Sequence, residues 1–404
     1  MLFRSAGINV SAIAQGSSER NISAVVRRED STRALRAVHS GFYLSAKTIS
    51  IGIIGPGMVG STLLAQIAEQ ASRLREQFNL DLRIRAIATS SKMLLDDRRI
   101  DLTDWQSALA DHGEDTDLDR LADHIHADHL PHSVLIDCTA SDRVAERYAE
   151  WLRRGIHVVT PNKKAFSAGY EYYRELQEAA REGSSHYFYE TTVGAALPVI
   201  QALRDLRETG DRIDTVEGIF SGTLAYLFNT FDGSRPFSEI VAEARASGYT
   251  EPDPRDDLSG MDVARKVIIL AREMGDALDV SELEIRSLVP EALQSGSVDD
   301  FLRRLPEYDD DMHRLLDEAR AEGKVLRYVG RLQRGGRASV DLVQLDRDHP
   351  FANINLTDNV VQFVSERYSA NPLVIQGPGA GPAVTAAGIF ADLLRLTAYV
   401  GGEE

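Results

Sequence analysis

The residues best suited to chemistry lie in the stretch EPDPRDDLSGMDVARK, which runs from Glu251 to Lys266. Asp262 and Lys266 are four positions apart, so their side chains would share one face of a helix. An acidic segment that leads into such a pair could hold an ammonium-bearing substrate beside a lysine that transfers a proton. The simpler interpretation is a solvated surface salt bridge, which contributes only roughly 0.2–0.5 kcal/mol. The rest of the chain has to decide between the two.

The same stretch also predicts its own local structure. Pro252 and Pro254 should keep the acidic part extended, because proline fixes φ and disfavours helix in the residue before it. Ser259 is a candidate N-cap for a following helix whose apolar positions have helical spacing. Asp253 and Asp256 have no evident partner, and we expect both to be solvated loop charges. The apolar positions of the helix are Val263, Val267, Leu270 and Met274.

The composition is ordinary for a soluble globular protein, with 43% hydrophobic and 26% charged residues among 404. This length allows two or three structural units. The net charge of −17 argues against nucleic acid or an anionic membrane as the main partner. No apolar run of membrane-spanning length stands out, and acidic residues near the start speak against a transit peptide. Because Cys138 is the single cysteine, there is no disulfide framework, and we expect a cytoplasmic protein.

A glycine-rich turn follows an apolar stretch, residues 48–54, that reads as a strand. The turn GPGMVG has the order G-x-G-x-x-G and opens an apolar helical pattern. Glycine suits this place because the turn is tight, the backbone approaches a pyrophosphate, and the helix N-terminus presents N–H groups to it. A turn that merely packs a helix on a strand is the alternative, but both flanks favour dinucleotide binding. The expected contacts are Gly55, Gly57, Met58, Val59 and Gly60.

The end of the next predicted strand, residues 82–88, should carry the group that reads the ribose. No acidic residue stands there, and Thr89, Ser90, Ser91 and Lys92 follow instead. Hydroxyl groups and a lysine suit a 2′-phosphate better than a pair of ribose hydroxyls. We therefore expect NADP as the cofactor, with NAD tolerated, and assign Ser91 and Lys92 to its binding.

Two later strands bring polar groups to the edge where doubly wound sheets hold ligands. Residues 133–141 read as a buried strand that ends in small and polar residues, and IHVVTPNKK then delivers Asn162, Lys163 and Lys164. Solubility is the alternative explanation for each lysine. The β-α-β alternation from 48 to 190 predicts one parallel sheet with helices on both faces. The cofactor contacts expected after the first of these strands are Cys138, Thr139 and Ala140.

Residues 111–132 are acidic and rich in histidine. A metal site is one interpretation of this run. We favour a solvated helix and loop, because the run is polar, has little apolar periodicity and contains no cysteine. The histidines are His112, His124, His126, His129 and His132.

The second half of the chain has the pattern of another domain. Alternating segments at 325–333, 338–345 and 359–364 predict an antiparallel sheet. The last segment reads as a strand, a glycine turn and an apolar helix that packs back on the first sheet. The expected parts are residues 1–45, a small remnant or linker with strands at 10–15 and 22–27 and a short helix after them; 46–190, the dinucleotide-binding domain; 191–370, the second domain; and 371–404, the C-terminal segment.

Several motifs occur together in one order: GPGMVG, VVTPNKKA, ETTVGAALPVI, GIFSGTL, the long acidic motif from Gly248 to Lys266, and GPGAGPAVTAAG. In these motifs the chain from about 48 to 404 resembles homoserine dehydrogenase, most closely the dehydrogenase half of bifunctional aspartokinase–homoserine dehydrogenase. Residues 1–45 resemble the last part of the aspartokinase regulatory region, which is of ACT type. No aspartokinase activity is expected.

The resemblance implies reversible hydride transfer between NAD(P)H and L-aspartate 4-semialdehyde, which gives L-homoserine for threonine, methionine and isoleucine biosynthesis. By motif position, Lys266 would donate and accept the proton at the substrate oxygen, and Asp262 would bind and orient substrate. Lys163 would reach both cofactor and substrate, with Lys164 the less suitable of the two. The other implied substrate contacts are Glu251, which would hold the α-ammonium, Asp257, Thr223, Gly248 and Tyr249.

The resemblance also implies a fold and further ligands. The fold would be α/β, a Rossmann-type doubly wound parallel sheet plus an α+β catalytic and dimerisation domain with an antiparallel sheet, in a homodimer or tetramer. Gly379 would approach the nicotinamide end of the cofactor. A monovalent cation such as Na+ or K+ would bind mostly to the backbone carbonyls of Glu190, Val193, Ala195 and Leu197.

Three questions stay open from the sequence. The frame would also suit another semialdehyde or amino-acid dehydrogenase, and residues 1–45 would suit a non-catalytic regulatory module that senses an amino acid. Burial would lower the pKa of Lys266, whereas Asp262 would raise it, and the sequence does not rank the two effects.

Overall fold

The computed structural model describes residues 8–15, 22–31, 33–35, 38, 47–127 and 130–401. The chain divides into two compact units that do not follow the chain order strictly. The short segment Lys163–Arg174 belongs to the second unit, although the residues on both sides of it belong to the first. The first unit is Met1–Asn162, Glu175–Tyr189 and Ile389–Glu404, and the second is Lys163–Arg174 and Glu190–Gly388.

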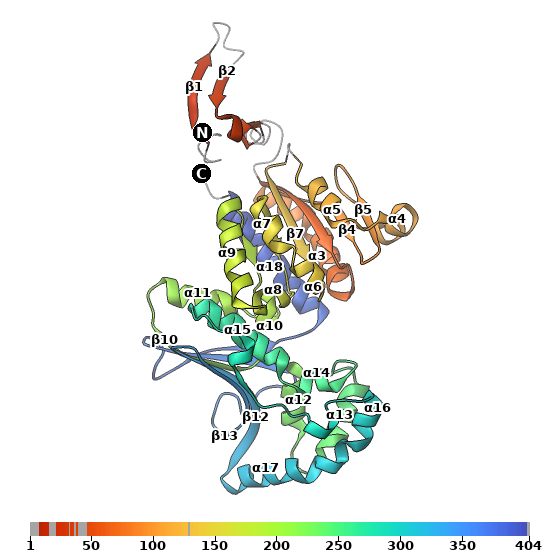
Figure 1. The fold of residues 1–404 in the computed structure, drawn as a ribbon, viewed down its shortest axis with the longest axis vertical. Coiled ribbons are helices and arrows are strands. Elements are labelled where there is room, and N and C mark those ends of the chain that lie inside the picture. The colour runs from red at the N-terminus through yellow and green to blue at the C-terminus, as the bar shows by residue number, and fades with distance from the viewer. Residues whose placement is uncertain are drawn as a thin grey trace. The chain divides into compact units, whose positions relative to one another are not determined.

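The first unit is built on a seven-stranded sheet of order β6-β5-β4-β3-β7-β8-β9 (Figure 1). Strands β4, β3, β7, β8 and β9 are parallel, as expected, whereas β5 and β6 are antiparallel additions at one edge. The reason is a tight turn, since Thr89 N donates to Lys92 O at 2.8 Å and so short a link must reverse the chain. The strands are β3 (Lys47–Ile54), β4 (Leu80–Ala88), β5 (Lys92–Leu95), β6 (Glu114–Asp115), β7 (His132–Asp137), β8 (Ile156–Val159) and β9 (Tyr187–Phe188).

The crossover helices of the first unit follow the β-α-β pattern. The crossover between β7 and β8 consists of two short helices, α6 and α7. The expected solvated run 111–132 contains α5, which buries Leu121, Ala122 and Ile125. His129 lies outside the described residues, and no group of metal-binding side chains is found among those that are described. The helices are α3 (Met58–Phe78), α4 (Trp105–His112), α5 (Leu118–Ile125), α6 (Asp142–Ala145), α7 (Tyr148–Arg153) and α9 (Tyr170–Gly183), whose first residues belong to the second unit.

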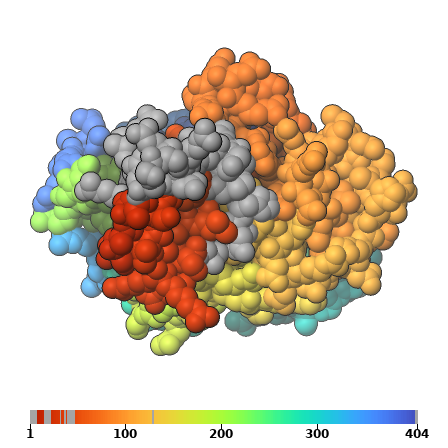
Figure 2. Space-filling view, turned by 90° about the horizontal axis from the view of Figure 1, so that it is seen from above, coloured from red at the N-terminus to blue at the C-terminus, as the bar shows by residue number. Residues whose placement is uncertain are grey.

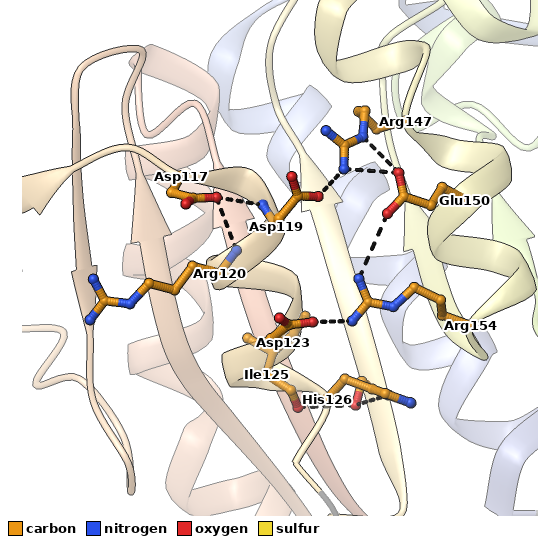
Figure 3. A network of polar contacts seen from close by, with 10 residues as sticks. Asp117, Asp119, Arg120, Asp123, Ile125, His126, Arg147, Glu150 and Arg154 are labelled. Carbon is orange, nitrogen blue, oxygen red and sulfur yellow. Dashed lines mark hydrogen bonds and ion pairs between the residues drawn. The ribbon is translucent and has the colours of Figure 1, made fainter.

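A ladder of ion pairs connects α5 to α7 (Figure 3). Arg147 contacts Asp119 and lies 2.8 Å from Glu150, and Arg154 contacts Asp123. Asp117 caps α5, because its carboxylate accepts from the backbone N–H groups of the second and third residues of the helix at 3.0 and 3.1 Å. These pairs are partly exposed, so each adds little stability on its own.

The second unit is built on a six-stranded sheet of order β11-β13-β12-β10-β14-β15. All neighbours are antiparallel except β11 and β13, which confirms the predicted antiparallel sheet. β15 pairs with β14, so the strand of the last segment belongs to this sheet, and only the later part of the segment, Ile389–Glu404, belongs to the first unit. The strands are β10 (Ile213–Ile219), β11 (Glu284–Ile285), β12 (Lys324–Gln333), β13 (Arg337–Asp346), β14 (Asp358–Ser365) and β15 (Leu373–Pro378).

Helix α15 packs on β12 and β13, while α12, α13, α16 and α17 gather beside the sheet (Figure 1). The close packing of α15 needs glycine on the strand below, because a Cβ at Gly330 would lie 2.7 Å from the Val267 side chain. The helices are α8 (Lys164–Ser167), α10 (Thr191–Gly194), α11 (Val199–Glu208), α12 (Gly222–Thr230), α13 (Phe237–Ala246), α14 (Pro254–Leu258), α15 (Met261–Met274), α16 (Val298–Arg304) and α17 (Asp309–Ala321), with 3-10 turns at Val280–Glu282, Glu291–Leu293 and Leu305–Tyr308.

The C-terminal helix α18 (Pro382–Gly401) corrects one expectation from composition. By length and hydropathy its segment Pro382–Val400 would suffice to cross a membrane, and it is the one such helix in the described part of the chain. Ala386, Ile389, Leu393 and Leu396 on one of its faces are buried, a spacing common in the core helices of globular proteins.

Near the N-terminus, β1 (Val10–Gln15) and β2 (Ile22–Val26) pair as an antiparallel hairpin, which confirms the two predicted strands. The hairpin forms a red group of atoms on the surface in Figure 2. A 3-10 turn follows at Arg28–Asp30, and the short helix expected after it lies only partly within the described residues.

Candidate active site

The acidic stretch is folded into two helices rather than one. Pro254 begins α14 instead of an extended segment, since a missing N–H is harmless in the first turn of a helix. Asp253 is the N-cap of α14, and its carboxylate also pairs with Arg255 at 2.6 Å, so it is not the solvated charge we expected. Asp256 is exposed, as expected.

The start of α15 also differs from the prediction. Its N-cap is Gly260 and not Ser259, whose hydroxyl instead accepts from Met261 N at 3.2 Å. Gly260 has a φ of 75°, and a Cβ there would overlap the Tyr328 hydroxyl, so both backbone and packing require glycine. This sharp turn directs the first turn of α15, with Asp262, back toward the acidic loop.

Asp262 lies between two ammonium groups. Its Oδ2 is 2.8 Å from Lys266 Nζ, and its Oδ1 is 3.1 Å from Lys163 Nζ. Lys266 is only 8% exposed, which rules out a solvated surface pair. Lys163 is the residue before α8 and begins the segment Lys163–Arg174. Its contact with Asp262 is one reason why this segment belongs to the second unit.

The ammonium of Lys266 is held from a second side by the backbone. Lys266 Nζ donates to Phe220 O at 2.6 Å, just beyond the end of β10. Asp262 and Phe220 account for two of its three N–H groups within the described part of the chain. The third N–H can meet a ligand oxygen.

Burial decides the question of charge that the sequence left open. Desolvation lowers the pKa of Lys266, and the carboxylate of Asp262 offsets this only in part. For Asp262, burial raises the pKa, but the charges of Lys266 and Lys163 outweigh it and hold the pKa below its usual range. The pair therefore combines an anionic acid with a lysine poised to release its proton.

A second group of the predicted residues lies around Asp257. Its Oδ2 accepts from Glu251 N at 2.8 Å, and burial raises its pKa to about 6. Thr223 Oγ1 donates to Tyr249 O at 2.6 Å, and its hydroxyl lies beside the Asp257 carboxyl and lowers the pKa of that group in part. Gly248, with a φ of 73°, makes the turn before Tyr249. The structure thus brings together all the predicted substrate residues of the second unit around a partly exposed acidic surface.

The glycine turn in the first unit has the features that a pyrophosphate needs. Gly55 has a φ of 83°, and a Cβ at Gly60 would overlap the Gly55 carbonyl oxygen. Gly57 is the N-cap of α3 without a side-chain cap, and a Cβ there would meet nothing within 4 Å. A diphosphate could therefore approach the first N–H groups of α3 closely. Met58 is 76% exposed beside this turn, and Val59 follows it in the first turn of α3.

The loop after β7 is fixed beside the glycine turn by a buried carboxylate that the sequence did not single out. Asp137 accepts from Tyr148 OH at 2.5 Å, Asn162 Nδ2 at 3.0 Å and Thr139 N at 2.8 Å. Cys138, Thr139 and Ala140 belong to this loop, and burial raises the pKa of the Cys138 thiol, which disfavours the reactive thiolate. In the sequence, the only feature that could have pointed to Asp137 was its place as an acid at the end of an apolar strand.

The turn expected to read the ribose is well ordered by its own hydrogen bonds. Thr89 Oγ1 accepts from Ser91 N at 3.3 Å and Lys92 N at 2.9 Å. Lys92 Nζ donates to Ala110 O at 2.9 Å, near the C-terminus of α4, and both Ser91 and Lys92 are exposed.

The stretch predicted to hold a cation contains an unusual backbone. Ala195 has a φ of 52° and a ψ of −112°, a conformation that alanine rarely adopts. The Glu190 carboxylate accepts from Ile200 N at 2.6 Å and Gln201 N at 2.8 Å, so it caps α11. The side chain of Glu190 is therefore occupied by hydrogen bonds to α11. Its backbone carbonyl, with those of Val193, Ala195 and Leu197, would have to supply the cation ligands.

Arg272, which the sequence gave no reason to select, anchors the segment of Lys163 to α15. Its guanidinium donates to Phe166 O at 2.7 Å and Ala168 O at 2.6 Å, and it pairs with Asp279 at 2.9 Å. The side chain is 3% exposed. Helix α15 thus carries Lys266 and also holds the segment of Lys163.

We expect Arg272→Met to lower kcat about tenfold, because Lys163 would lose its fixed position beside Asp262. The loss should be much smaller in a Lys163→Met background, since coupled residues are not additive. Steady-state kinetics of both single variants and the double variant measure this, with Arg265→Met on the same helix as the control. Additive losses would show that Arg272 acts by another route.

A glycine turn at a strand–helix junction and a buried acid–lysine set are the features of a nicotinamide-dependent oxidoreductase with separate cofactor and catalytic units. Family models give the more specific result. The NAD binding domain of homoserine dehydrogenase matches residues 55–190, homoserine dehydrogenase matches 198–394, and an ACT domain matches 2–42. The chain belongs to the homoserine dehydrogenase family.

Curated relatives agree with this assignment. A homoserine dehydrogenase of Paracoccidioides brasiliensis is 43% identical over 374 residues, which are 87% of this chain and 99% of the relative. The chloroplastic bifunctional aspartokinase/homoserine dehydrogenase 2 of Arabidopsis thaliana is 53% identical over 399 residues, 98% of this chain but 44% of that protein. The chain therefore spans less than half the length of that bifunctional relative.

Solved structures share the fold. A Candida auris protein of unknown function superimposes with a TM-score of 0.81 at 38% identity, over 88% of this chain and 99% of that one. A hyperthermophilic archaeal homoserine dehydrogenase in complex with NADPH gives 0.68 at 23% identity, over 87% and 98%. At that identity the second match supports the fold alone.

Proposed function

We propose that the chain catalyses the reversible reduction of L-aspartate 4-semialdehyde to L-homoserine. The observation that carries the proposal is the buried lysine Lys266, paired with Asp262 and left with one N–H for a ligand oxygen. Hydride addition to an aldehyde develops negative charge on its oxygen, so a proton donor must stand within hydrogen-bond reach. The family assignment selects the semialdehyde among the aldehydes that this chemistry would accept.

In the reduction, the bound nicotinamide supplies the hydride. Lys266 Nζ donates its proton to the aldehyde oxygen, and in the oxidation the same amine removes the proton from the hydroxyl. Burial lowers the pKa of Lys266, which makes the ammonium a better proton donor in the reduction and makes the free amine easier to populate for the oxidation. Asp262 keeps the ammonium oriented and receives Lys163 on its other oxygen. Glu251 and Asp257 hold the α-ammonium of the substrate, with Thr223, Gly248 and Tyr249 beside it.

The KM for L-homoserine should depend on pH through Asp257. Its pKa is raised to about 6, so the carboxylate that attracts the ammonium is present above pH 6 and is lost as the pH falls below it. We expect the KM to rise by up to about tenfold per pH unit below 6, and Asp257→Asn to have a high KM that no longer changes there. Initial rates between pH 5 and 8 measure this, with the exposed Asp256→Asn as the control. An equal KM across this range would exclude Asp257 from ammonium binding.

For the cofactor we propose NADP, with NAD tolerated. The proposal is supported by Ser91 and Lys92 in the turn between β4 and β5 and by the lack of an acid in that turn, Thr89–Lys92. Lys92 would have to share or leave the carbonyl of Ala110 to reach a 2′-phosphate. Paired steady-state assays with both cofactors test this, and Lys92→Ala should weaken NADP more than NAD. A clear preference of the wild type for NAD would overturn it.

We also propose that a monovalent cation binds the backbone carbonyls of Glu190, Val193, Ala195 and Leu197. The unusual conformation of Ala195 supports it, because a conformation costing about 1–3 kcal/mol needs a compensating interaction. We expect a higher Tm in NaCl or KCl than in choline chloride at equal ionic strength. Equal Tm values in the three salts would contradict the binding of a monovalent cation at these carbonyls.

Assembly and location are proposals as well. A homo-oligomer is supported by the edge strand β15, whose residues are alternately exposed and whose Val374 is 39% exposed. Light scattering after size exclusion tests it, and a monomer at micromolar concentration would contradict it. The plant relatives are described as chloroplastic, and we retain the cytoplasm as the expected location here.

Two alternatives can be separated by substrate. Another dehydrogenase on this frame would turn over L-glutamate, or L-aspartate 4-semialdehyde with phosphate, faster than L-homoserine. A non-catalytic amino-acid sensor, which the ACT match at residues 2–42 favours, would bind an amino acid without changing the cofactor. NADP+ reduction with L-homoserine above all other substrates is the expected result, and its failure would refute the proposed function.

A further inference from the structure

A second side chain shares the backbone oxygen that holds Lys266. Asn359, in β14, donates from Nδ2 to Phe220 O at 3.2 Å, while Lys266 Nζ donates to the same oxygen at 2.6 Å. A carbonyl oxygen has two lone pairs, so these two donors can fix its direction fully. Asn359 is 1% exposed, which means that its amide has no freedom to turn to solvent.

The register of the sheet explains how these distant residues meet. β14 pairs with β10 through Val360 and Ile219, which brings Asn359 beside Phe220. On its other side β14 pairs with β15 through Asn359 and Gly377, which brings the end of β15 against the same amide. Asn359 is therefore placed by two strand pairings at once.

Gly379, just past β15, closes the space behind this amide. A Cβ at position 379 would lie 2.5 Å from Asn359 Oδ1 and would overlap the rest of the amide. Gly379 does not have a positive φ, so its backbone conformation alone does not call for glycine. The amide of Asn359 supplies a reason for glycine here that is independent of the cofactor.

The oxygen of the Asn359 amide, Oδ1, is buried and has no hydrogen-bond partner in the described part of the chain. A buried, unpaired oxygen is costly, and an apolar side chain of similar shape would avoid that cost. The donor Nδ2 is thus the useful end of this side chain.

We propose that Asn359 is a positioning residue for Lys266, which it controls through the shared carbonyl of Phe220, and that Gly379 is glycine to leave room for it. The proposal rests on the proposed role of Lys266 in proton transfer. Asn359 holds the carbonyl in place and competes with the ammonium for it, so the bond from Lys266 is weaker than an unshared one would be. The amine form of Lys266 is favoured in consequence.

The kinetic test is the pH dependence of kcat for L-homoserine oxidation, in which Lys266 must start as the free amine. Asn359→Ala frees the carbonyl for the ammonium, so we expect the rising limb of the profile to move to higher pH. At neutral pH kcat should fall about tenfold, with little change in the KM for either substrate. Asn353→Ala, which removes an exposed asparagine of the same unit, is the control. An unchanged profile in folded Asn359→Ala would overturn the proposal.

A second test needs no activity and so separates this proposal from the proposed function. Gly379→Ala should lower the midpoint of urea unfolding in the wild type and lower it much less in the Asn359→Ala background. Additive effects would show that the two residues do not press on each other and would overturn the proposal. If Asn359→Ala does not fold, Asn359→Leu, which also lacks a donor, replaces it in the kinetic test, and Asn359→Ser replaces it in the unfolding cycle. A wild type without dehydrogenase activity would refute the proposed function, while the unfolding cycle would still test the contact.

Discussion

Replacing Lys266 with alanine should reduce kcat by about 10²–10⁴-fold, the usual contribution of a positioned general acid or base. The ammonium lies 2.8 Å from Asp262 and 2.6 Å from Phe220 O, and a water held by the same two acceptors would be a far weaker acid. NADPH binding should change little, because Lys266 is not among the residues assigned to the cofactor. Stopped-flow or steady-state rates, together with NADPH fluorescence titration, measure both quantities.

The matched variant is Lys266→Arg, which keeps the positive charge. Arginine does not release its proton near neutral pH, so this variant should be almost as slow as Lys266→Ala. Rates within a factor of a few of the wild type in either variant would remove Lys266 from the chemistry. Circular dichroism would show whether both variants have lost the folded state. In that case Lys266→Met, which keeps the volume of the side chain, would replace them in the rate measurement.

Removal of Asp262 has the second-largest expected effect, because two ammonium groups depend on one carboxylate. In Asp262→Asn, Lys266 and Lys163 would face each other without the carboxylate that lies between them. The pKa of Lys266 should fall further, so the rising limb of the kcat profile for oxidation should move to lower pH. Loss of orientation should reduce the plateau of kcat by about 10²-fold.

The stability of Asp262→Asn should fall by less than the about 3–5 kcal/mol typical of a broken buried pair, because the Asp262 side chain is 39% exposed. Urea unfolding measures this, with Asp256→Asn as the control on the exposed face of α14. A plateau of kcat and a pH profile equal to those of the wild type would mean that Asp262 neither orients Lys266 nor raises its pKa.

Much of the fold follows from local patterns in the sequence. The glycine turn, the parallel strands on both sides of it and the alternating strands of the second unit were all predicted, because period and turn chemistry act over a few residues. The pairing of Asp262 with Lys266 was equally local, at helical spacing. What the sequence left undecided was whether this pair is buried.

The errors have a common physical origin. Ser259 and Pro254 were assigned from propensity, but the packing of Gly260 against Tyr328 set where α15 begins. The strand β15 was grouped with the segment that packs back on the first sheet, although it pairs with β14, a partner that only tertiary structure specifies. Propensity is a weak guide where tertiary contacts choose among similar local structures.

The supporting residues could not have been found from spacing. Asn359 meets the Phe220 carbonyl across 139 positions, and Arg272 meets that of Phe166 across 106. Both side chains donate to backbone oxygens, and every residue type has a backbone oxygen. The type of the partner residue therefore does not reveal the contact. A single sequence carries no signal for such contacts.

NADPH consumption by the purified chain with L-aspartate 4-semialdehyde, with the product identified by mass spectrometry, tests the proposed reaction itself. The proposed reaction forms one L-homoserine for each NADPH oxidised, and Lys266→Ala should abolish nearly all of this rate. NADPH oxidation no faster than without the protein, or a product other than L-homoserine, would contradict it.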